Sequence, residues 1–276
     1  MLPAVVVHGG AGNPRPERIG DGSEHHAALR AAVEAAIAAL PHGALAAARA
    51  AVELLEDDPL FNASRGSVPA SDGRVEMDAS VMDGGTGAAG AVAAVTTVRH
   101  PVALAHAVAD HSPHLLLAGD GADRFAADRG LERMDPAWFL SGRDATAGPG
   151  TVGAVVLDER GALAAATSSG GRRGQLPGRV GDSAVIGAGT WADGRRAVSM
   201  TGDGEAILRR LSAHAVAASP APLAQACDDA LAALGEVEAG LIAVDASGAI
   251  AMPFNTRVMH RGWWTGAGGA PETAVY

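Results

Sequence analysis

The spacing of apolar side chains predicts a chain of interleaved helices and strands. Alanine, leucine and valine recur at helical spacing from about Glu24 to Leu40 and from Ala44 to Glu56. The second stretch is expected to end at Asp57-Asp58-Pro59, because proline disfavours helix in the residue before it. The same pattern predicts helices over residues 101–110, 121–128, 204–218 and 223–234.

Short apolar or alternating runs predict the strands. They cover residues 3–7, 75–82, 89–98, 151–157, 162–167, 197–201, 241–244 and 249–252. Two pairs are expected to be hairpins, around residues 158–161 and 246–248. Helices interleaved with antiparallel pairs favour an α+β fold, in which helices cover the sheets, over a doubly wound sheet.

Residues 130–150 interrupt this order. They lose periodicity and contain several glycines and prolines, which predicts an exposed linker. Thr151 follows directly and opens an apolar strand. Taken alone, this position is typical of any good β-former, so the pattern by itself does not indicate catalysis.

Composition narrows the function classes. The 276 residues are 48% hydrophobic, enough for one substantial core. Net charge is −10 with no basic stripe, which disfavours nucleic-acid binding. No apolar run reaches the ~18 residues of a membrane span, and Met1–Gly12 lacks a signal-peptide pattern. With one cysteine, Cys227, this predicts a cytoplasmic protein without a disulfide.

The 37 glycines gather in knots beside hydroxyl, arginine and aspartate side chains. Such a set suits a small zwitterionic substrate. Arg179 can hold a carboxylate in bidentate fashion, Asp182 can pair with an ammonium, and glycine amides can form an oxyanion hole. The alternative is an ordinary surface Arg–Asp pair in a polar loop, which contributes little.

Long motifs follow one another along nearly the whole chain: HGGAG (His8–Gly12), LLEDDPLFNASRGSV (Leu54–Val68), EMDASVMDG (Glu76–Gly84), HSPHLLLAGDGADRFA (His111–Ala126), GTVGAVVLD (Gly150–Asp158), ATSSGG, GRVGDS, TGDGE and MPFNTRVMHRG (Met252–Gly262). This series resembles the plant-type asparaginase and isoaspartyl peptidase family of N-terminal-nucleophile hydrolases. The resemblance implies a four-layer αββα sandwich and one domain, residues 1–276. It also implies a cut into an α subunit (1–150) and a β subunit (151–276), assembled as a dimer of αβ heterodimers.

The resemblance also implies the chemistry. Thr151 is expected to attack the carbonyl of Gly150, cut the chain, and then hydrolyse asparagine or β-aspartyl dipeptides. Its freed α-amine, with an ordinary pKa of ~7.7–8.0, would serve as the base. Asn62 is expected to order the cleavage site. Ser169 stands where the family usually has threonine and is expected to tune the nucleophile.

Further positions carry binding roles by the same resemblance. Arg179, Asp182 and Gly202 match the residues that hold the substrate, and Thr201 with Gly202 matches the oxyanion hole. No cofactor is required, but a structural sodium ion is expected on the backbone of a loop formed by Leu55, Glu56, Phe61, Ala63 and Arg65. Ser64 stands where the family often has glycine, and Arg65 adds a charge there.

Several alternatives compete. A glycosylasparaginase-like activity and an uncut, ligand-binding pseudoenzyme share the fold; a taspase-like endopeptidase fits a chain this compact less well. His8-Gly9-Gly10 resembles a lipase oxyanion loop, but no Gly-x-Ser-x-Gly elbow occurs. Gly85–Gly90 fits G-x-G-x-x-G without the βαβ context that the motif needs. The histidines between positions 100 and 114 lack metal-ligand spacing.

Overall fold

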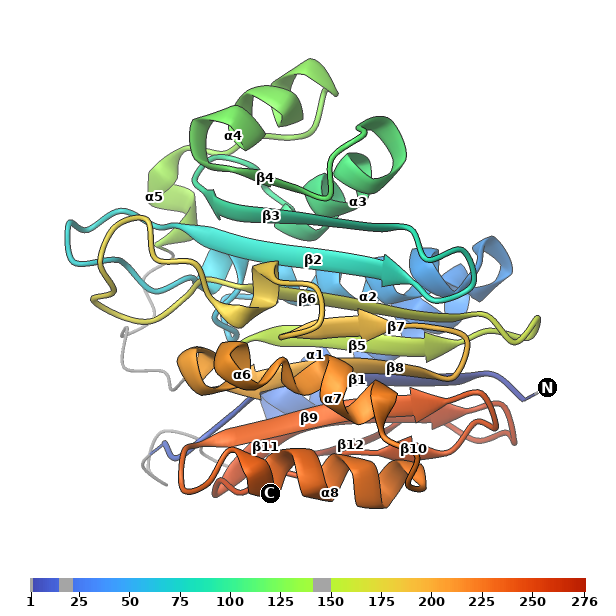
Figure 1. Cartoon of the computed structure of the whole chain (residues 1–276). Helices are drawn as coiled ribbons and strands as arrows, with labels where there is room; N and C mark the ends of the chain where they lie inside the picture. The colour runs from blue at the N-terminus through green and yellow to red at the C-terminus, as the bar shows by residue number, and fades with distance from the viewer. Residues whose placement is uncertain (1, 15–21, 141–149) are drawn as a thin grey trace.

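Two sheets stacked face to face, with helices on both outer surfaces, make up the molecule (Figure 1). The structure is a computed structural model that describes residues 2–14, 22–140 and 150–276. In order across the larger sheet, the strands are β12 (Glu272–Ala274), β11 (Val258–Thr265), β1 (Ala4–Gly12), β5 (Val152–Leu157), β6 (Leu163–Ser169), β2 (Met77–Asp83), β3 (Ala89–Val95) and β4 (Leu116–Ala118). The smaller sheet has the order β10 (Ile250–Ala251), β9 (Ala239–Asp245), β8 (Arg196–Gly202) and β7 (Thr190–Ala192).

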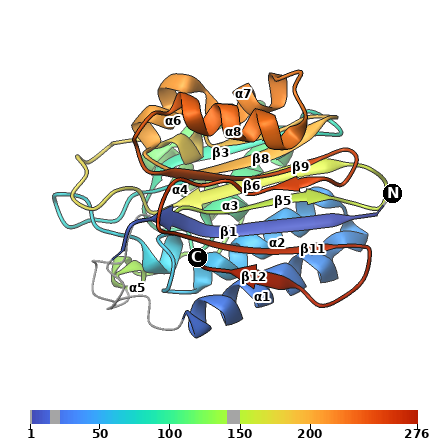
Figure 2. The same cartoon turned by 90° about the horizontal axis from the view of Figure 1, so that it is seen from below.

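The helices divide between the two outer faces. They are α1 (Ser23–Ala39), α2 (Ala44–Asp57), α3 (Pro101–His111), α4 (Gly119–Asp128), α5 (Pro136–Phe139), α6 (Gly204–Arg210), α7 (Ser212–Ala218) and α8 (Leu223–Ala233). Figure 2 shows α1 and α2 below the larger sheet and α6–α8 above the smaller one. The layers therefore run helix, sheet, sheet, helix, which confirms the α+β sandwich expected from the sequence.

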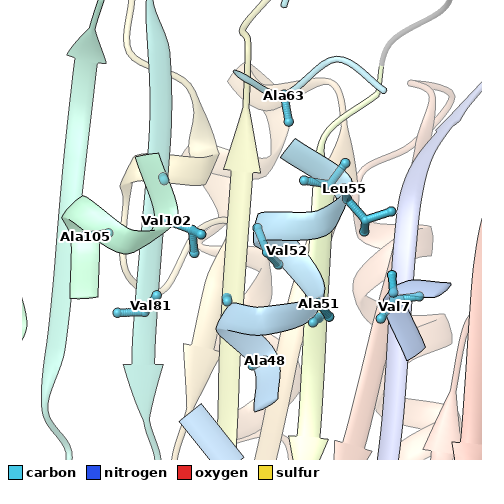
Figure 3. Close-up of a cluster of buried hydrophobic side chains, with 14 of the residues drawn as sticks. Val7, Ala48, Ala51, Val52, Leu55, Ala63, Val81, Val102 and Ala105 are labelled. Atoms are coloured by element: carbon cyan, nitrogen blue, oxygen red, sulfur yellow. The ribbon is translucent and has the colours of Figure 1, made fainter. Parts of the chain in front are cut away.

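The helix pattern of α2 explains how it packs. Ala48, Ala51, Val52 and Leu55 recur at a spacing of three and four, so they share one face, and all are fully buried against the larger sheet (Figure 3). Small alanines let the helix lie close to the strands. The smaller sheet is covered in the same way by α7 and α8, whose buried residues include Val216.

The central strands are buried on both faces because they lie between a helical layer and the other sheet. Along β5, Val156 faces the helices, whereas Val155 and Leu157 pack on the smaller sheet with Ile242 and Val244 of β9. This inter-sheet core accounts for continuous apolar runs in the sequence where a strand exposed on one face would alternate.

The structure corrects the predicted linker over residues 130–150. Before the undescribed residues 141–149, the chain packs against the body: the Met134 amide donates to the Thr97 carbonyl, and Val98 bridges Arg133. Helix α5 begins after Asp135, whose side chain caps it, and buries Phe139. Its aromatic and apolar residues therefore make residues 131–139 part of the fold.

Other differences follow from the backbone. The helix expected over residues 204–218 is two helices, because Leu211 adopts φ 51° between α6 and α7. The pattern did not predict β4, β7, β11 or β12. In β11, Trp263 and Trp264 pack on opposite faces of the sheet. Strands β3 and β4 pair in parallel, whereas the other pairs among the described strands are antiparallel.

Gly153 in β5 offers a direct test of this packing. A Cβ there would lie 2.1 Å from the Ser199 hydroxyl and 2.4 Å from Nε2 of His8. Gly153→Ala should therefore destabilise the protein by about 1–3 kcal/mol, lowering the melting temperature by several degrees. Gly121→Ala, at an exposed position of α4 where a Cβ would meet nothing nearer than Arg124 Nη2 at 4.0 Å, should raise it slightly. A Gly153→Ala variant as stable as wild type in thermal melting would contradict this packing.

Candidate active site

One cavity gathers every residue assigned to catalysis, substrate binding or self-cleavage. It has a volume of about 410 Å³. Its walls include Asn62, Gly150, Thr151, Ser169, Arg179, Asp182, Thr201 and Gly202. These positions lie between Asn62 and Gly202 in the sequence, and the stacking of the two sheets brings them together. The surface Arg–Asp alternative is wrong, because Asp182 is only 5% exposed and lines this cavity.

Two hydroxyl groups meet where β5 begins and β6 ends. These strands are antiparallel, with Val152 opposite Ser168, so their neighbours Thr151 and Ser169 lie side by side. Both side chains are buried. The Thr151 hydroxyl donates to the Ser169 hydroxyl at 3.3 Å, and the Gly171 amide donates to the same oxygen at 3.1 Å. Ser169 is therefore held at a fixed distance from the oxygen expected to react.

Buried polar groups of the neighbouring strands pack against β5, which begins directly after Thr151. Nε2 of His8 lies 2.9 Å from the Ser199 hydroxyl, which lies 2.8 Å from the Thr167 hydroxyl. Burial lowers the pKa of His8 to about 3, so its imidazole is neutral at physiological pH. Both the His8 and Ser199 side chains lie close to Gly153, two residues after Thr151, at the place where a Cβ would be. His8 is thus a buried support for β5 and does not take the place of a lipase oxyanion loop.

Thr201 and Gly202 end β8, in the other sheet. The Thr201 hydroxyl accepts a hydrogen bond from the amide of Ala11 in β1 at 3.3 Å, linking the two sheets beside the cavity. Gly202 has φ 133°. A Cβ there would lie 2.3 Å from the Glu238 carbonyl oxygen, so this wall accepts only glycine.

Asn62 ties two loops together next to Gly150. Its Nδ2 donates to the Gly171 carbonyl at 2.7 Å, and its Oδ1 accepts from the Val68 amide at 3.0 Å. Its own carbonyl accepts from the Gly170 amide at 2.8 Å. A Cβ built on Gly150 would lie 3.5 Å from the amide nitrogen of Asn62. The side chain therefore fixes the surroundings of the Gly150–Thr151 bond.

Arg179 is oriented by Glu205. Its Nε and Nη2 donate to the two Glu205 oxygens at 2.8 and 3.1 Å, and its Nη1 donates to Gln175 at 3.2 Å. These hydrogen bonds lower the pKa of Glu205 to about 2. Arg172 also donates to Glu205, at 2.8 Å. Because a guanidinium carries five N–H groups, Arg179 keeps donors for a ligand carboxylate beyond those bonded to described residues.

Asp182 carries an oxygen without a partner. Among the residues that the structure describes, none hydrogen-bonds its buried Oδ2. Burial raises the pKa of Asp182 to about 7, while the charge of Arg179 opposes the shift. A Cβ on Gly204 would lie 2.7 Å from Asp182 Oδ1 and 2.8 Å from Arg179 Nη2, so this glycine lets α6 approach both side chains. Asp182 lines the cavity, and a carboxylate there can accept a hydrogen bond from a ligand ammonium.

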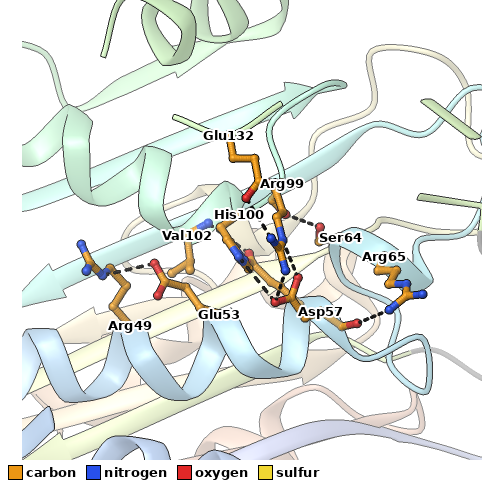
Figure 4. Close-up of polar contacts among 10 residues, drawn as sticks. Arg49, Glu53, Asp57, Ser64, Arg65, Arg99, His100, Val102 and Glu132 are labelled. Carbon is orange, nitrogen blue, oxygen red and sulfur yellow. Dashed lines mark hydrogen bonds and ion pairs between the residues drawn. The ribbon is translucent and has the colours of Figure 1, made fainter. Parts of the chain in front are cut away.

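The expected sodium loop lies beside a network of ion pairs (Figure 4). Arg99 bridges Asp57 and Glu132, and the Ser64 hydroxyl donates to the Arg99 carbonyl. Arg65 donates to the Asp57 carbonyl at 3.5 Å, and buried Glu56 accepts from the Val102 amide.

Some of the expected sodium ligands already have hydrogen-bond partners. The carbonyls of Leu55 and Ala63 accept from the amides of Asp58 and Gly66. A carbonyl oxygen has a second lone pair, so these bonds do not prevent cation binding, and the carbonyl of Phe61 lies close against Gly66. The sodium site of Leu55, Glu56, Phe61, Ala63 and Arg65 stays a prediction.

The competing motifs take structural roles. Gly85 and Gly87 lie in the turn between β2 and β3, so the glycine pattern does not open a helix there. His100 binds Glu56, and His106 binds Asp110 and Arg49. Within residues 2–14, 22–140 and 150–276, no group of three His, Cys, Asp or Glu side chains could hold a metal. In the same ranges, the structure contains no helix of the length and apolarity that crossing a membrane requires.

Sequence reasoning missed several residues of the cavity. Arg172, Asp203, Glu236 and Glu238 also line it, and Glu205 lies directly behind Arg179. The TGDGE motif contains two of these acids, but only the fold shows that Glu205 points back to Arg179. No motif in the sequence marked Glu236 and Glu238, which follow α8. They reach the cavity wall only because β9 pairs within the smaller sheet.

Comparison with known proteins shows which family the chain resembles. The family model described as Asparaginase matches residues 1–148 and 142–273. The isoaspartyl peptidases of Salmonella typhimurium and Escherichia coli are each 43% identical, covering 99% of this chain and 98% and 95% of their own lengths. A plant-type L-asparaginase of Pyrobaculum calidifontis is also 43% identical, over 95% of this chain and 97% of its own.

The raised pKa of Asp182 predicts a pH-dependent stability difference. A carboxyl that titrates near 7 when folded, against an ordinary 3.8, costs stability as the pH rises from about 4 to 7. Asp182→Asn cannot ionise, so its stability relative to wild type should grow over that range, by at most about 4 kcal/mol. Urea unfolding at pH 4, 6 and 8 measures this. Exposed Asp228→Asn serves as the control, and a constant difference for Asp182→Asn would refute the raised pKa.

Proposed function

The chain belongs to the asparaginase family, and we propose that it cuts itself before Thr151 and hydrolyses L-asparagine and β-aspartyl (isoaspartyl) dipeptides. One observation carries the proposal: a single cavity places the Thr151 hydroxyl in reach of Ser169 and in the company of Arg179 and Asp182. Hydroxyl nucleophile, cation and carboxylate are the groups needed to cut an amide whose other end is an amino acid.

Self-cleavage comes first in the proposed sequence. In the continuous chain, the nitrogen of Thr151 is an amide and cannot act as a base. The Thr151 hydroxyl oxygen attacks the carbonyl carbon of Gly150 and forms an ester, the C–N bond breaks, and the nitrogen takes up the proton that the hydroxyl loses and becomes an α-amine. Water then hydrolyses the Gly150 ester. The two fragments stay together, because β5 pairs with β1 on one side and β6 pairs with β2 on the other.

Turnover then uses the new amine. It accepts the proton of the Thr151 hydroxyl, whose oxygen attacks the side-chain carbonyl carbon of the substrate. Thr201 and Gly202, on the opposite wall, stabilise the oxyanion. The leaving ammonia or amino acid takes the proton, and water releases aspartate from the β-aspartyl ester. This chemistry requires no cofactor.

Recognition of the substrate's amino-acid end follows from the charges on the cavity wall. The remaining guanidinium N–H groups of Arg179 bind the α-carboxylate, and the carboxylate of Asp182 accepts from the α-ammonium. The family resemblance further supports a structural sodium ion in the 55–65 loop, a dimer of αβ heterodimers and a cytoplasmic location, each as part of the same proposal.

Intact-mass spectrometry of the purified protein under denaturing conditions tests the self-cleavage step. Wild type should give two species separated between Gly150 and Thr151. Thr151→Ala should give one uncut chain without activity on β-aspartyl dipeptides, because the attacking oxygen is gone. Thr86→Ala, in the exposed turn between β2 and β3, should behave as wild type. An uncut wild-type chain after long incubation would instead favour the binding-only alternative, and an active Thr151→Ala would exclude this mechanism.

A further inference from the structure

Strand β2 holds the backbone on both sides of Asp182. The amide of Gly181 donates to Asp78 Oδ2 at 2.7 Å. The hydroxyl of Ser80 donates to the carbonyl of Ser183, also at 2.7 Å. Asp78 and Ser80 are two residues apart on one strand, so their side chains project from the same face. The residues directly before and after Asp182 are therefore fixed to a single rigid element.

A β-bulge accompanies Asp78. The pairing of β2 with β3 shifts register between Met77 and Ala79. Ala94, in the bulged strand, adopts φ 50°, a left-handed conformation that is unfavourable for a non-glycine residue. Its amide donates to Asp78 Oδ1 at 2.9 Å. Bulges next to functional sites re-aim side chains, and this one accompanies a carboxylate whose other oxygen holds Gly181.

Asp78 also adds charge near Asp182. It is 2% exposed, and burial raises its pKa to about 6 against the two backbone hydrogen bonds. The charged groups facing Asp182 are Arg179 before it, Asp78 on β2 and Glu205 on α6. Since Arg179 is already paired with Glu205, the buried pair of Asp78 and Asp182 leaves an excess of negative charge around the unpaired oxygen.

We propose that Asp78 is a positioning residue for the substrate's α-ammonium group: through the Gly181 amide it sets the place of the Asp182 carboxylate, and its own charge strengthens the attraction of the cation. Ser80 completes this arrangement from the other side. The inference rests on the proposed function. Asp78 does not line the cavity, so it acts through Asp182 and is not a catalytic residue.

Ser80 also links this arrangement to the second sheet. Its hydroxyl lies 2.8 Å from that of Thr190 in β7, and Thr190 donates to Thr167 in β6 at 2.6 Å. These side chains are fully buried between the sheets. The position of the segment Gly181–Ser183 (the Asp182 segment) therefore depends on contacts with both sheets. These contacts keep the Asp182 carboxylate in place before the ligand binds.

Substitution of Asp78 by asparagine removes one acceptor and one charge with little change of shape. An amide has a single oxygen, so either the Gly181 or the Ala94 amide would face an NH₂ group. Asp123→Asn is a matched control. Asp123 is also buried and accepts two backbone hydrogen bonds, from Thr96 and Thr97, but it lies in α4 and touches no part of the Asp182 segment.

The decisive comparison uses two ligands of the processed enzyme: L-asparagine, and succinamic acid, which lacks only the α-ammonium. For L-asparagine, Asp78→Asn should raise KM roughly tenfold with kcat little changed. The acid limb of its kcat/KM profile should move to lower pH, because loss of a neighbouring negative charge lowers the pKa of Asp182. Inhibition by succinamic acid should be unaltered. Self-cleavage, followed by intact mass, should match wild type.

Equal losses for both ligands, an unmoved acid limb, or the same changes in Asp123→Asn would overturn the proposal. If Asp78→Asn does not fold, Ser80→Ala gives the second test: KM for asparagine should rise without a change in the acid limb, since no charge is removed. If wild type hydrolyses nothing, the proposed function fails, and calorimetry with L-aspartate and succinate still decides the inference. A loss of affinity for aspartate alone would support it, and a loss for both ligands would refute it.

Discussion

The close contact between β5 and the groups behind it determines where the chemistry takes place. Gly153 has no side chain, so His8 and Ser199 lie directly against the backbone of β5. With this strand fixed between β1 and β6, Thr151 is held beside Ser169. A Cβ at Gly153 would lie 2.1 Å from the Ser199 hydroxyl and 2.4 Å from Nε2 of His8 and would displace β5, so the position of Thr151 depends on this missing Cβ.

The site combines this rigid apolar frame with polar groups that the frame does not fully satisfy. Asp182 is buried with one oxygen unpaired, and its pKa is raised to about 7. Such a group lowers the stability of the free protein, and a ligand ammonium would remove that cost on binding. Asp78 and the strained backbone at Ala94 are part of the same arrangement. Locally unfavourable structure is retained there, and it holds Asp182 in position before the ligand binds.

Much of the fold could be predicted from the sequence, because the regular spacing of apolar residues indicates which face of a helix or strand is buried. The helical spacing in α2 and the apolar run of β5 located those elements correctly, whereas the run at residues 3–7 marked only the first part of β1, which continues to Gly12. Elements set by tertiary contacts escaped: Leu211 breaks a helix, and β11 forms only where β1 offers a partner. The expected site residues lie together as the family motifs indicated, whereas the support given by Glu205, Asp78 and Ser80 depends on which way side chains point between distant strands. That information is three-dimensional, and single-sequence spacing does not contain it.

Trapping of the reaction intermediate tests the central claim, that the Thr151 oxygen attacks the substrate. The processed protein is mixed with L-asparagine, quenched in acid during turnover, and its fragments are weighed and digested. We predict an added β-aspartyl group on the peptide that begins with Thr151, and none when substrate is omitted. Turnover with no modified fragment under conditions that preserve esters, or a label on any other residue, would contradict the account.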